Sequence, residues 1–375
     1  IKIAANELQI DEVSVSVGNA GMLPQVGLNL IDNNSVQYLS QTRSDGSVVE
    51  RDNAKNNSLN YGIALDWTLF DGLKMFADYE QLKETQKLGE AQLKQVILNK
   101  VGEVMITYFD LVQQKQQLTA LDSTIIISEQ RVDLAYNRFI IGKASKLEVL
   151  NAQVDLNTDQ TLMQRQKELY MNTKVQLNEY LARDLKIDFE VVPEIFVDQA
   201  LQLPELESLV AKENPTLQAE QINKRISELE LKQTKALRYP TVFASTGYNF
   251  GRTESSLGFT TSSNSRGWNY GFGASLNIFD GFNQNRNEKI AKIQIETTEV
   301  AIAQRTQELM SLVNTTYQTY LTNISLIELE GKNEAIAQEN MEITVEKYRI
   351  GIIPTIEFRT AQFLKMPLQH HLGWD

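Results

Sequence analysis

Cysteine and histidine, two of the side chains most often used as nucleophile, general base or transition-metal ligand, are nearly missing from this chain of 375 residues. It has no cysteine, which excludes thiolate nucleophiles, disulfides and cysteine-based zinc sites. Its two histidines, His370 and His371, are adjacent, so neither a Ser-His-Asp triad nor a histidine-based metal site can be assembled. We therefore expect no enzymatic activity, no metal site and no cofactor.

Two glutamates recur in equivalent surroundings, and they are the candidates for a function based on charge. The stretch FIIGKASKLEVLNAQ, residues 139 to 153, aligns without a gap with YRIGIIPTIEFRTAQ, residues 348 to 362. Glu148 and Glu357 then occupy the same position, 209 residues apart. Carboxylates held in a narrow space repel one another, which raises their apparent pKa and attracts cations. Alternatively, both are solvated residues in the first turn of a helix, where the helix dipole favours acidic side chains.

A second pair of stretches shows the same offset. YGIALDWTLFDG, residues 61 to 72, corresponds to YGFGASLNIFDG, residues 270 to 281, with Tyr, Gly, Phe, Asp and Gly at identical positions. An offset held over so much of the chain indicates a tandem duplication, which determines the architecture. We expect a first copy over residues 1–182, an irregular link over 183–215 and a second copy over 216–375.

Apolar and polar residues alternate in both of these stretches, which is typical of strands with one apolar face. Alternation also follows Pro24 and Pro240, so each copy is expected to contain a β-hairpin, with long polar loops over 31 to 60 and 251 to 269. Runs of about 9 to 11 residues are long enough to cross a bilayer in a tilted barrel. A hairpin packed on the helices of a soluble protein alternates in the same way. The candidate lipid-facing side chains are Ile63, Leu65, Trp67, Leu69, Phe272, Leu276 and Ile278.

Apolar residues spaced by seven follow each hairpin, and this spacing predicts helices that pack as coiled coils. Residues 72 to 139 contain no proline, and a helix of that length would be about 100 Å long. Gly142 and Gly351 are expected to turn the chain with positive φ, and Ser145 to cap the returning helix. Each copy is therefore expected to contain a helix, a β-hairpin, a long helix, a tight turn and an antiparallel returning helix. The heptad positions include Ile97, Leu111, Met163, Tyr170, Leu177, Ile327, Met341 and Tyr348.

The charge and hydropathy of the chain exclude two further classes. The formal net charge is -12 and no basic face is evident, so we expect no binding of nucleic acid, whose phosphate backbone requires one. No run approaches the roughly 18 apolar residues of a membrane-spanning helix. A membrane function would therefore have to rely on the strands.

The order of these features resembles the TolC-like outer-membrane efflux protein family. The resemblance rests on the tip stretches RFIIGKASKLEVLNAQ and KYRIGIIPTIEFRTAQ, the strand entries at Pro24 and Pro240, both FDG sequences and Asn214-Pro215. It implies an α+β membrane protein in which a homotrimer pools four strands per chain in one twelve-stranded barrel, surrounded by outer-membrane lipid. Coiled-coil helical hairpins would continue as a tunnel through the periplasm. A periplasmic adaptor would connect this tunnel to an inner-membrane pump.

The resemblance also implies roles for individual residues. Asp71-Gly72 and Asp280-Gly281 would mark the passage from barrel to tunnel, with glycine supplying backbone freedom and aspartate a helix cap. The helix-turn-helix tips would form the periplasmic entrance and the adaptor-binding surface, and their two glutamates resemble the constriction carboxylates of the family. A further acidic position of the family is Thr360 in this chain. The tip residues are Arg138, Gly142, Leu147, Glu148, Lys347, Gly351, Ile356 and Glu357.

The expected function is a passive exit duct of a tripartite efflux or type I secretion system. The alternative is a trimeric coiled-coil surface or scaffold protein without transport, and a periplasmic adaptor is a third interpretation. The first helix of the family is mostly missing, and the last helix is not continued by residues 363–375, which contain Pro367. We therefore expect a partial chain and assign no function to residues 363–375.

Overall fold

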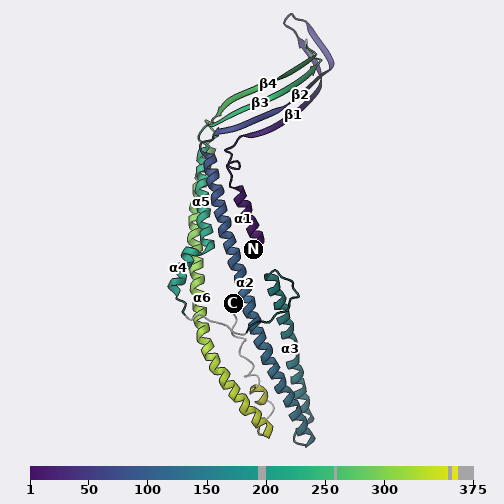
Figure 1. Ribbon diagram of the computed structural model, residues 1–375, viewed down its shortest axis with the longest axis vertical. Coiled ribbons are helices and arrows are strands. Elements are labelled where there is room, and N and C mark those ends of the chain that lie inside the picture. The colour runs from purple at the N-terminus through teal and green to yellow at the C-terminus, as the bar shows by residue number, and fades with distance from the viewer. Residues whose placement is uncertain (193–199, 257–259, 354–356, 362–375) are drawn as a thin grey trace. The chain divides into compact units, whose positions relative to one another are not determined.

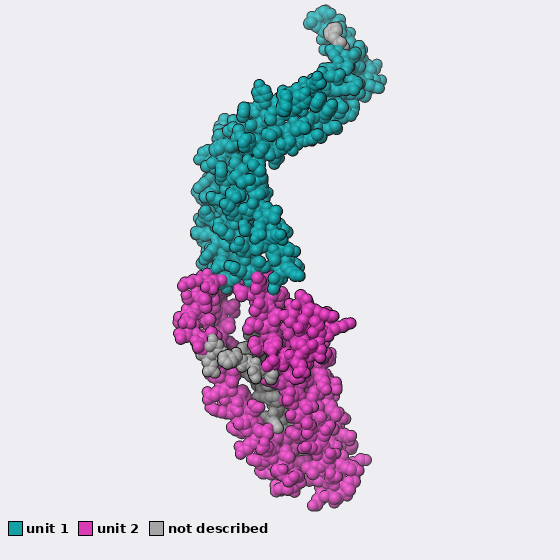
Figure 2. Space-filling view, viewed as in Figure 1, with its two compact units in different colours: residues 1–94, 214–306 teal, residues 95–213, 307–375 magenta. Residues whose placement is uncertain are grey.

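The computed structural model describes residues 1–192, 200–256, 260–353 and 357–361. The chain divides into two compact units, residues 1–94 with 214–306 and residues 95–213 with 307–375 (Figure 2). Each unit combines one part of the first copy with the corresponding part of the second. The two repeats of the sequence therefore do not coincide with the two compact units, because each unit is built from both copies.

Four antiparallel strands form a single sheet in the first unit, in the order β1-β2-β3-β4 (Figure 1). They are β1 (Gln25–Thr42), β2 (Val48–Phe70), β3 (Thr241–Ser255) and β4 (Ser262–Ser275). The first copy supplies β1 and β2, and the second supplies β3 and β4. The prediction of one β-hairpin per copy is confirmed.

The predicted long polar loops are wrong for most of their length. Residues 31 to 60 continue β1 and β2, and only residues 43 to 47 turn the chain, with Gly46 at a φ of +83°. Residues 251 to 255 likewise extend β3, and residues 262 to 269 belong to β4. These segments lack apolar alternation, but their residues pair across the two strands from Asn33 with Ser58 onwards, with one register shift between Gln37 and Leu39. Backbone pairing with a neighbour thus maintains strands where the side-chain pattern carries no signal.

β4 ends earlier than the alternation predicts, at Ser275, so Leu276 and Ile278 lie outside the strand. Ser275 pairs with Thr241, the first residue of β3. Thr241 follows Pro240, which has no backbone N–H to donate to a ladder. The neighbouring strand therefore offers no partner to residues 276 to 278.

Two complete helices and the beginnings of two long helices form the rest of the first unit. These helices are α1 (Lys2–Ser14), α5 (Pro215–Ala236) and the beginnings of α2 (Lys74–Ile140) and α6 (Asn283–Ile350). Gln233 Nε2 of α5 donates to Gln81 Oε1 of α2 at 2.5 Å, and Gln284 Nε2 of α6 donates to the Thr234 carbonyl of α5 at 2.6 Å. Each long helix is thereby tied to α5.

The second unit contains the rest of α2 and α6 together with α3 (Lys146–Tyr180) and α4 (Leu203–Glu213). The uninterrupted helix predicted after the first hairpin is confirmed, since α2 has 67 residues. α2 and α3 are antiparallel, as predicted, and Leu111 of α2 packs against Tyr170 and Leu177 of α3. A second cluster is formed by Met341, Tyr348, Phe358 and Ala361. Of the heptad positions, Ile97 and Ile327 remain exposed.

Residues 183 to 192 of the link are held against the end of α3. Asn178 Nδ2 donates to the Leu185 and Ile187 carbonyls at 3.1 and 2.9 Å. Lys174 Nζ donates to Asp188 Oδ1 at 2.5 Å, and this hydrogen bond lowers the pKa of the Asp188 carboxyl. Polar side chains of α3 thus anchor a segment that has no regular secondary structure, which was the expectation for this part of the link.

Candidate functional site at the hairpin tips

The two turns that end the long helices have the same backbone conformation. Gly142 has a φ of +77° and Gly351 a φ of +81°, in the left-handed region that glycine adopts without steric cost. After each glycine, an N–H donates back to the last turn of its helix, to the Arg138 carbonyl at 2.8 Å or the Lys347 carbonyl at 3.1 Å. These bonds satisfy helix carbonyls that would otherwise lack partners. Both predicted turns are confirmed.

Glu148 connects the two hairpins at this end of the second unit. Ser145 caps α3 as predicted, because its Oγ accepts a hydrogen bond from the Glu148 N–H at 3.3 Å. The Glu148 carboxylate accepts a hydrogen bond from the Tyr348 hydroxyl at 3.1 Å and lies 3.7 Å from Arg138 Nη1. The Arg138 guanidinium lies over the Tyr348 ring, 5.6 Å from its centroid. Side chains of α2, α3 and α6 therefore meet at one carboxylate.

A network of buried charges lies further along α2 and α3. Asp159 is fully buried and accepts hydrogen bonds from Ser128 Oγ at 2.5 Å and from Arg359 Nη1 and Nη2 at 3.1 and 3.0 Å. One turn earlier on α3, Asp155 accepts a hydrogen bond from Arg131 Nη2 at 2.6 Å. Two carboxylates of the first copy thus hold one arginine from each copy, and the four charges balance.

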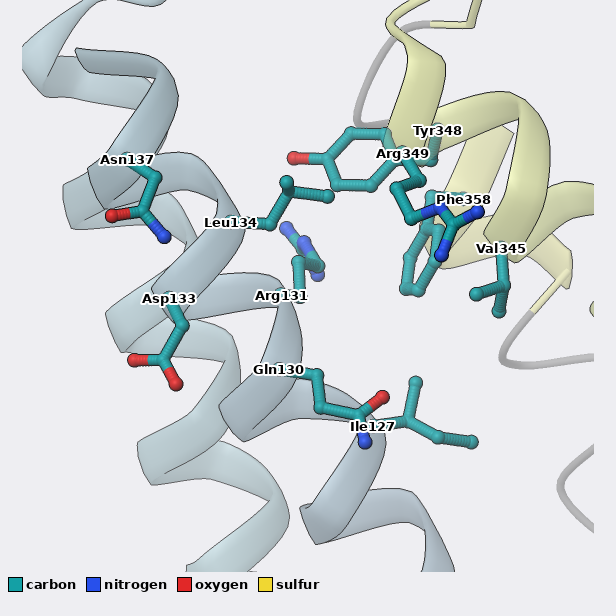
Figure 3. A pocket seen from close by; sticks show the side chains of 10 residues that line it. All are labelled: Ile127, Gln130, Arg131, Asp133, Leu134, Asn137, Val345, Tyr348, Arg349 and Phe358. Atoms are coloured by element: carbon teal, nitrogen blue, oxygen red, sulfur yellow. The ribbon is translucent and has the colours of Figure 1, made fainter. Parts of the chain in front are cut away.

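Arg131 is the least satisfied member of this network. It is only 3% exposed, and its Nε and Nη1 have no hydrogen-bond partner within the part of the chain that the structure describes. Its guanidinium lies 5.9 Å from the centroid of the Phe358 ring and borders a cavity of about 300 Å³ between α2 and α6. Figure 3 shows Leu134 of α2 and Phe358 on either side of it. Arg131 therefore brings a positive charge to the wall of this cavity, and Asp155 balances that charge.

The structure brings some of the predicted tip residues together and leaves others apart. Arg138 and Glu148 are neighbours, as described above. Ile356 lies outside the described residues. Four further positions that the sequence singled out are exposed: Leu147, Lys347, Glu357 and Thr360.

Tyr348 and Arg359 belong to the site, although the sequence patterns did not identify them as site residues. The heptad pattern places Tyr348 in the core, where it is 1% exposed, but it does not show that its hydroxyl group reaches Glu148. One sequence signal distinguishes both residues: at the offset of 209, Tyr348 corresponds to Phe139 and Arg359 to Leu150. A polar side chain at a position that is apolar in the other copy needs a polar partner when it is buried.

The sheet of the first unit offers a second candidate surface, because it has one apolar and one polar face. Cross-strand partners share a face, and one row consists of Leu28, Ile63, Tyr248 and Trp268. The rings of Tyr248 and Trp268 meet edge to face, with centroids 5.3 Å apart. Neighbouring rows add Val26, Leu30, Tyr61, Leu65, Trp67, Phe250, Tyr270 and Phe272.

Apart from Asp66 and Phe243, the opposite face carries mainly small and uncharged polar residues, as in the row of Asn29, Gly62, Asn249 and Gly267. The predicted lipid-facing residues are divided by this geometry. Ile63, Leu65, Trp67 and Phe272 lie on the apolar face, Leu69 lies where the register shifts between Thr68 and Phe70, and Leu276 and Ile278 follow β4.

Both FDG sequences have the same local structure. Gly72 and Gly281 have φ values of +74° and +67°, and the residue after each glycine also has a positive φ. The Asp71 carboxylate accepts a hydrogen bond from the backbone N–H four residues later at 3.0 Å, and Asp280 does the same at 2.6 Å. The predicted roles of glycine in backbone freedom and aspartate in helix capping are confirmed.

The described ranges contain neither a cluster of potential metal ligands nor a helix apolar enough to cross a membrane. Within them, no three or more His, Cys, Asp or Glu side chains are placed to hold a metal ion. None of the helices in these ranges carries an apolar stretch that could cross a membrane.

A family model described as "Outer membrane efflux protein" matches residues 1–183 and 206–364. The chain belongs to the outer membrane efflux protein family. The two matched ranges nearly coincide with the two copies of the repeat. No curated protein matches this efflux channel significantly.

Solved outer-membrane channels have a similar fold. The channel OprN matches with a TM-score of 0.78 at 15% identity, over 97% of this chain and 80% of that one. CmeC of Campylobacter jejuni matches with 0.77 at 16%, over 97% and 77%, and VceC of Vibrio cholerae with 0.74 at 12%, over 97% and 86%. At such low identities this likeness establishes the fold.

Family membership establishes the class of function. This efflux channel is an outer-membrane protein that extends into the periplasm, and it is a conduit, not an enzyme. Channels of the family are trimeric and act with efflux pumps. The alternative of a scaffold without transport is therefore set aside.

Proposed function

We propose that three copies of this chain form the exit duct of a tripartite efflux or type I secretion system. Each protomer contributes four strands to one twelve-stranded barrel, and its helices line a tunnel from the periplasm. The chain is divided into repeats over residues 1–182 and 216–375, joined by the link 183–215. Asp71-Gly72 and Asp280-Gly281 mark the passage from barrel to tunnel, and an inner-membrane pump supplies the energy.

The observation that carries this proposal is the division of the sheet into an exposed apolar face and a small, polar face. An apolar face that runs across all four strands suits lipid, while the other face suits a water-filled lumen. β1 and β4 are edge strands of the chain, and open strand edges are not tolerated in lipid. Pairing β1 of one protomer with β4 of the next protomer closes the barrel.

The lack of native cysteine allows the two faces to be tested directly. Single cysteines replace Trp268, Asn269, Tyr270 and Gly271, which alternate between the faces of β4. In outer-membrane vesicles we expect a membrane-impermeant maleimide to label positions 269 and 271, and a lipid-soluble one to label 268 and 270. Equal labelling of all four positions by the impermeant reagent would exclude the barrel.

The two hairpin tips are the proposed periplasmic entrance and adaptor-binding surface. Leu147 is 65% exposed beside a rigid turn, and Lys347 is exposed next to the corresponding turn of the second copy. A photo-reactive amino acid at Leu147 is expected to crosslink in living cells to an adaptor anchored in the inner membrane. The matched control is Val154, which is 62% exposed on the same helix two turns further on. Identical adducts from both positions would argue against a docking surface at the tip.

We assign the constriction of the duct to Glu148 and Glu357. In a trimer these residues supply six carboxylates around one axis, which attracts cations. The Glu148 charge is partly compensated by Arg138, whereas Glu357 is exposed. We therefore expect Glu357→Gln to reduce the preference for cations in planar bilayers more than Glu148→Gln does. Unchanged ion selectivity and cation block in the double variant would remove the carboxylates from the gate.

A further inference from the structure

The face of the sheet opposite the apolar face, here called the small-residue face, contains one ionisable group and one aromatic ring. This face comprises alternate residues of 25–31, 60–68, 243–251 and 265–275. Asp66 is its only charged residue and Phe243 its only aromatic one, and it has no lysine or arginine. The remaining positions are glycine, alanine, serine, threonine, asparagine, glutamine and one isoleucine. A solute moving along this face therefore meets two distinctive side chains.

The outer edge of the Phe243 ring lies over a glycine of the neighbouring strand. It pairs with Gly273 of β4, and a Cβ atom on Gly273 would overlap with the edge of the Phe243 ring. The residue is nevertheless 42% exposed, so part of the side chain is open to solvent. The glycine thus fixes the ring against the sheet with its surface available for contact.

Asp66 lies one row away from this ring on the same face. It pairs with Gln25 of β1 and Ser245 of β3, while Phe243 pairs with Thr68 in the adjacent row. Diagonal neighbours of this kind have Cα atoms about 7–8 Å apart, within reach of an aromatic side chain. Asp66 is exposed, and beside Ser245 in its row a Cβ atom on Gly271 would meet nothing within 4 Å. The carboxylate and the ring therefore border a common open space.

From this geometry we propose that Asp66 and Phe243 form a contact site for organic ammonium cations on the lumen face. The inference rests on the proposed function, because it requires the small-residue face to line the duct. The carboxylate supplies charge attraction, and the ring supplies a cation–π contact of the kind that selects quaternary ammonium groups. Since no basic residue lies on this part of the face, nothing on it competes with the cation for Asp66. In a trimer the site occurs three times around one axis.

The proposal separates two kinds of selectivity along the face. Asp66 acts on any cation through its charge, whereas Phe243 distinguishes an alkylated ammonium, which loses little hydration on contact with a ring, from a small hydrated ion such as K⁺. Organic cations should therefore be retained by both residues, and inorganic cations by Asp66 alone.

The test is isothermal titration of the detergent-purified trimer with tetrapropylammonium chloride. We expect saturable binding by the wild type that weakens about fivefold in Asp66→Asn and about threefold in Phe243→Leu, in line with single exposed contacts of these types. Phe243→Tyr should retain binding because it keeps the aromatic face. The matched control is Asp32→Asn, which removes the same charge from the opposite face of the sheet, where Asp32 pairs with Leu59.

Two outcomes would overturn the proposal. One is the absence of saturable binding by a wild-type trimer, and the other is an equal loss of affinity in Asp32→Asn and Asp66→Asn. The variants are first checked for trimer mass by light scattering, so that misfolding cannot imitate lost binding. A wild type that is not a trimer, or failure of the impermeant maleimide to label the single-cysteine variants at positions 269 and 271, would instead refute the proposed channel.

Discussion

The two copies of the repeat form turns with the same backbone conformation, but they contribute different side chains to the hydrogen bonds and ion pairs near these turns. At the tips, Gly142 and Gly351 have nearly identical backbone conformations. The side chains of the buried network differ: the first copy provides the acids Asp155 and Asp159, and the second provides Arg359. A duplicated chain can therefore conserve local geometry while the two copies become complementary in charge.

The junctions between sheet and helices show the same difference in another form. Gly72 and Gly281 have φ values of +74° and +67°. A Cβ atom on Gly72 would overlap with the carbonyl oxygen of Ala236 at the end of α5, whereas on Gly281 its nearest neighbour would be Asn283 Nδ2 at 3.8 Å. Backbone conformation is common to both copies, but close packing exists at only one of them.

The largest expected effect comes from giving the second copy the residue of the first at the buried ion pair. Arg359→Leu, which introduces the residue found at position 150, leaves Asp159 buried without its bidentate partner. We expect a loss of about 3–5 kcal/mol of stability, measured by thermal unfolding of the second unit in the whole protein. The double variant Arg359→Leu with Asp159→Leu should recover most of this loss, because it removes both charges. Equal destabilisation by the single and double variants would contradict the pairing.

The two junction glycines should respond unequally to the same substitution. Gly281→Ala should cost about 1 kcal/mol for the left-handed backbone alone. Gly72→Ala should cost roughly 2–4 kcal/mol, because the new methyl group also meets the backbone of Ala236. Urea denaturation of the two variants side by side measures the difference. Equal costs would show that the contact at Ala236 relaxes freely.

Tyr348→Phe tests the hydrogen bond at the tip, and it again introduces the residue of the other copy, Phe139. Loss of the hydroxyl group that donates to Glu148 should reduce stability by about 1 kcal/mol. Tyr136→Phe is the matched control, since Tyr136 is 54% exposed on α2 and should change stability very little. Thermal melts of the two variants in parallel provide the measurement, and a smaller shift for Tyr348 than for Tyr136 would contradict the structure.

The smallest effect is expected from pH at the link between the copies. The hydrogen bond from Lys174 lowers the pKa of Asp188 from its ordinary value of 3.8. Since the folded pKa is below the unfolded one, the stabilisation is present above the unfolded pKa and is lost progressively as the pH falls through the lowered folded value. Limited proteolysis of residues 183–192 should therefore accelerate below pH 4 in the wild type. Asp188→Asn should remove this acid-dependent acceleration, while Asp122→Asn, an exposed control on α2, should retain it.

Sequence patterns predicted the helices and turns well because the information they need is local. The heptad spacing and the lack of proline in α2, and the glycines at the two tips, each specify a backbone conformation within a few residues. The polar halves of the strands were missed because residues such as Asn33 and Ser58 form a strand only by pairing with each other. Leu276 was placed in a strand by alternation, although the missing N–H of Pro240 in the neighbouring chain segment ends the ladder.

By itself the sequence determined the duplication and the positions of the tips and junctions, since these follow from residues that recur at a constant offset. Its resemblance to a known family indicated the class of function. Only the tertiary structure decided which side chains act together. Tyr348 reaches Glu148 and Arg359 reaches Asp159 across 200 residues of sequence, and Asp66 and Phe243 share a face through the register of β2 and β3. Such pairs depend on how separate elements pack, and the energy of a buried charge or a ring on a glycine depends on neighbours that no local pattern specifies.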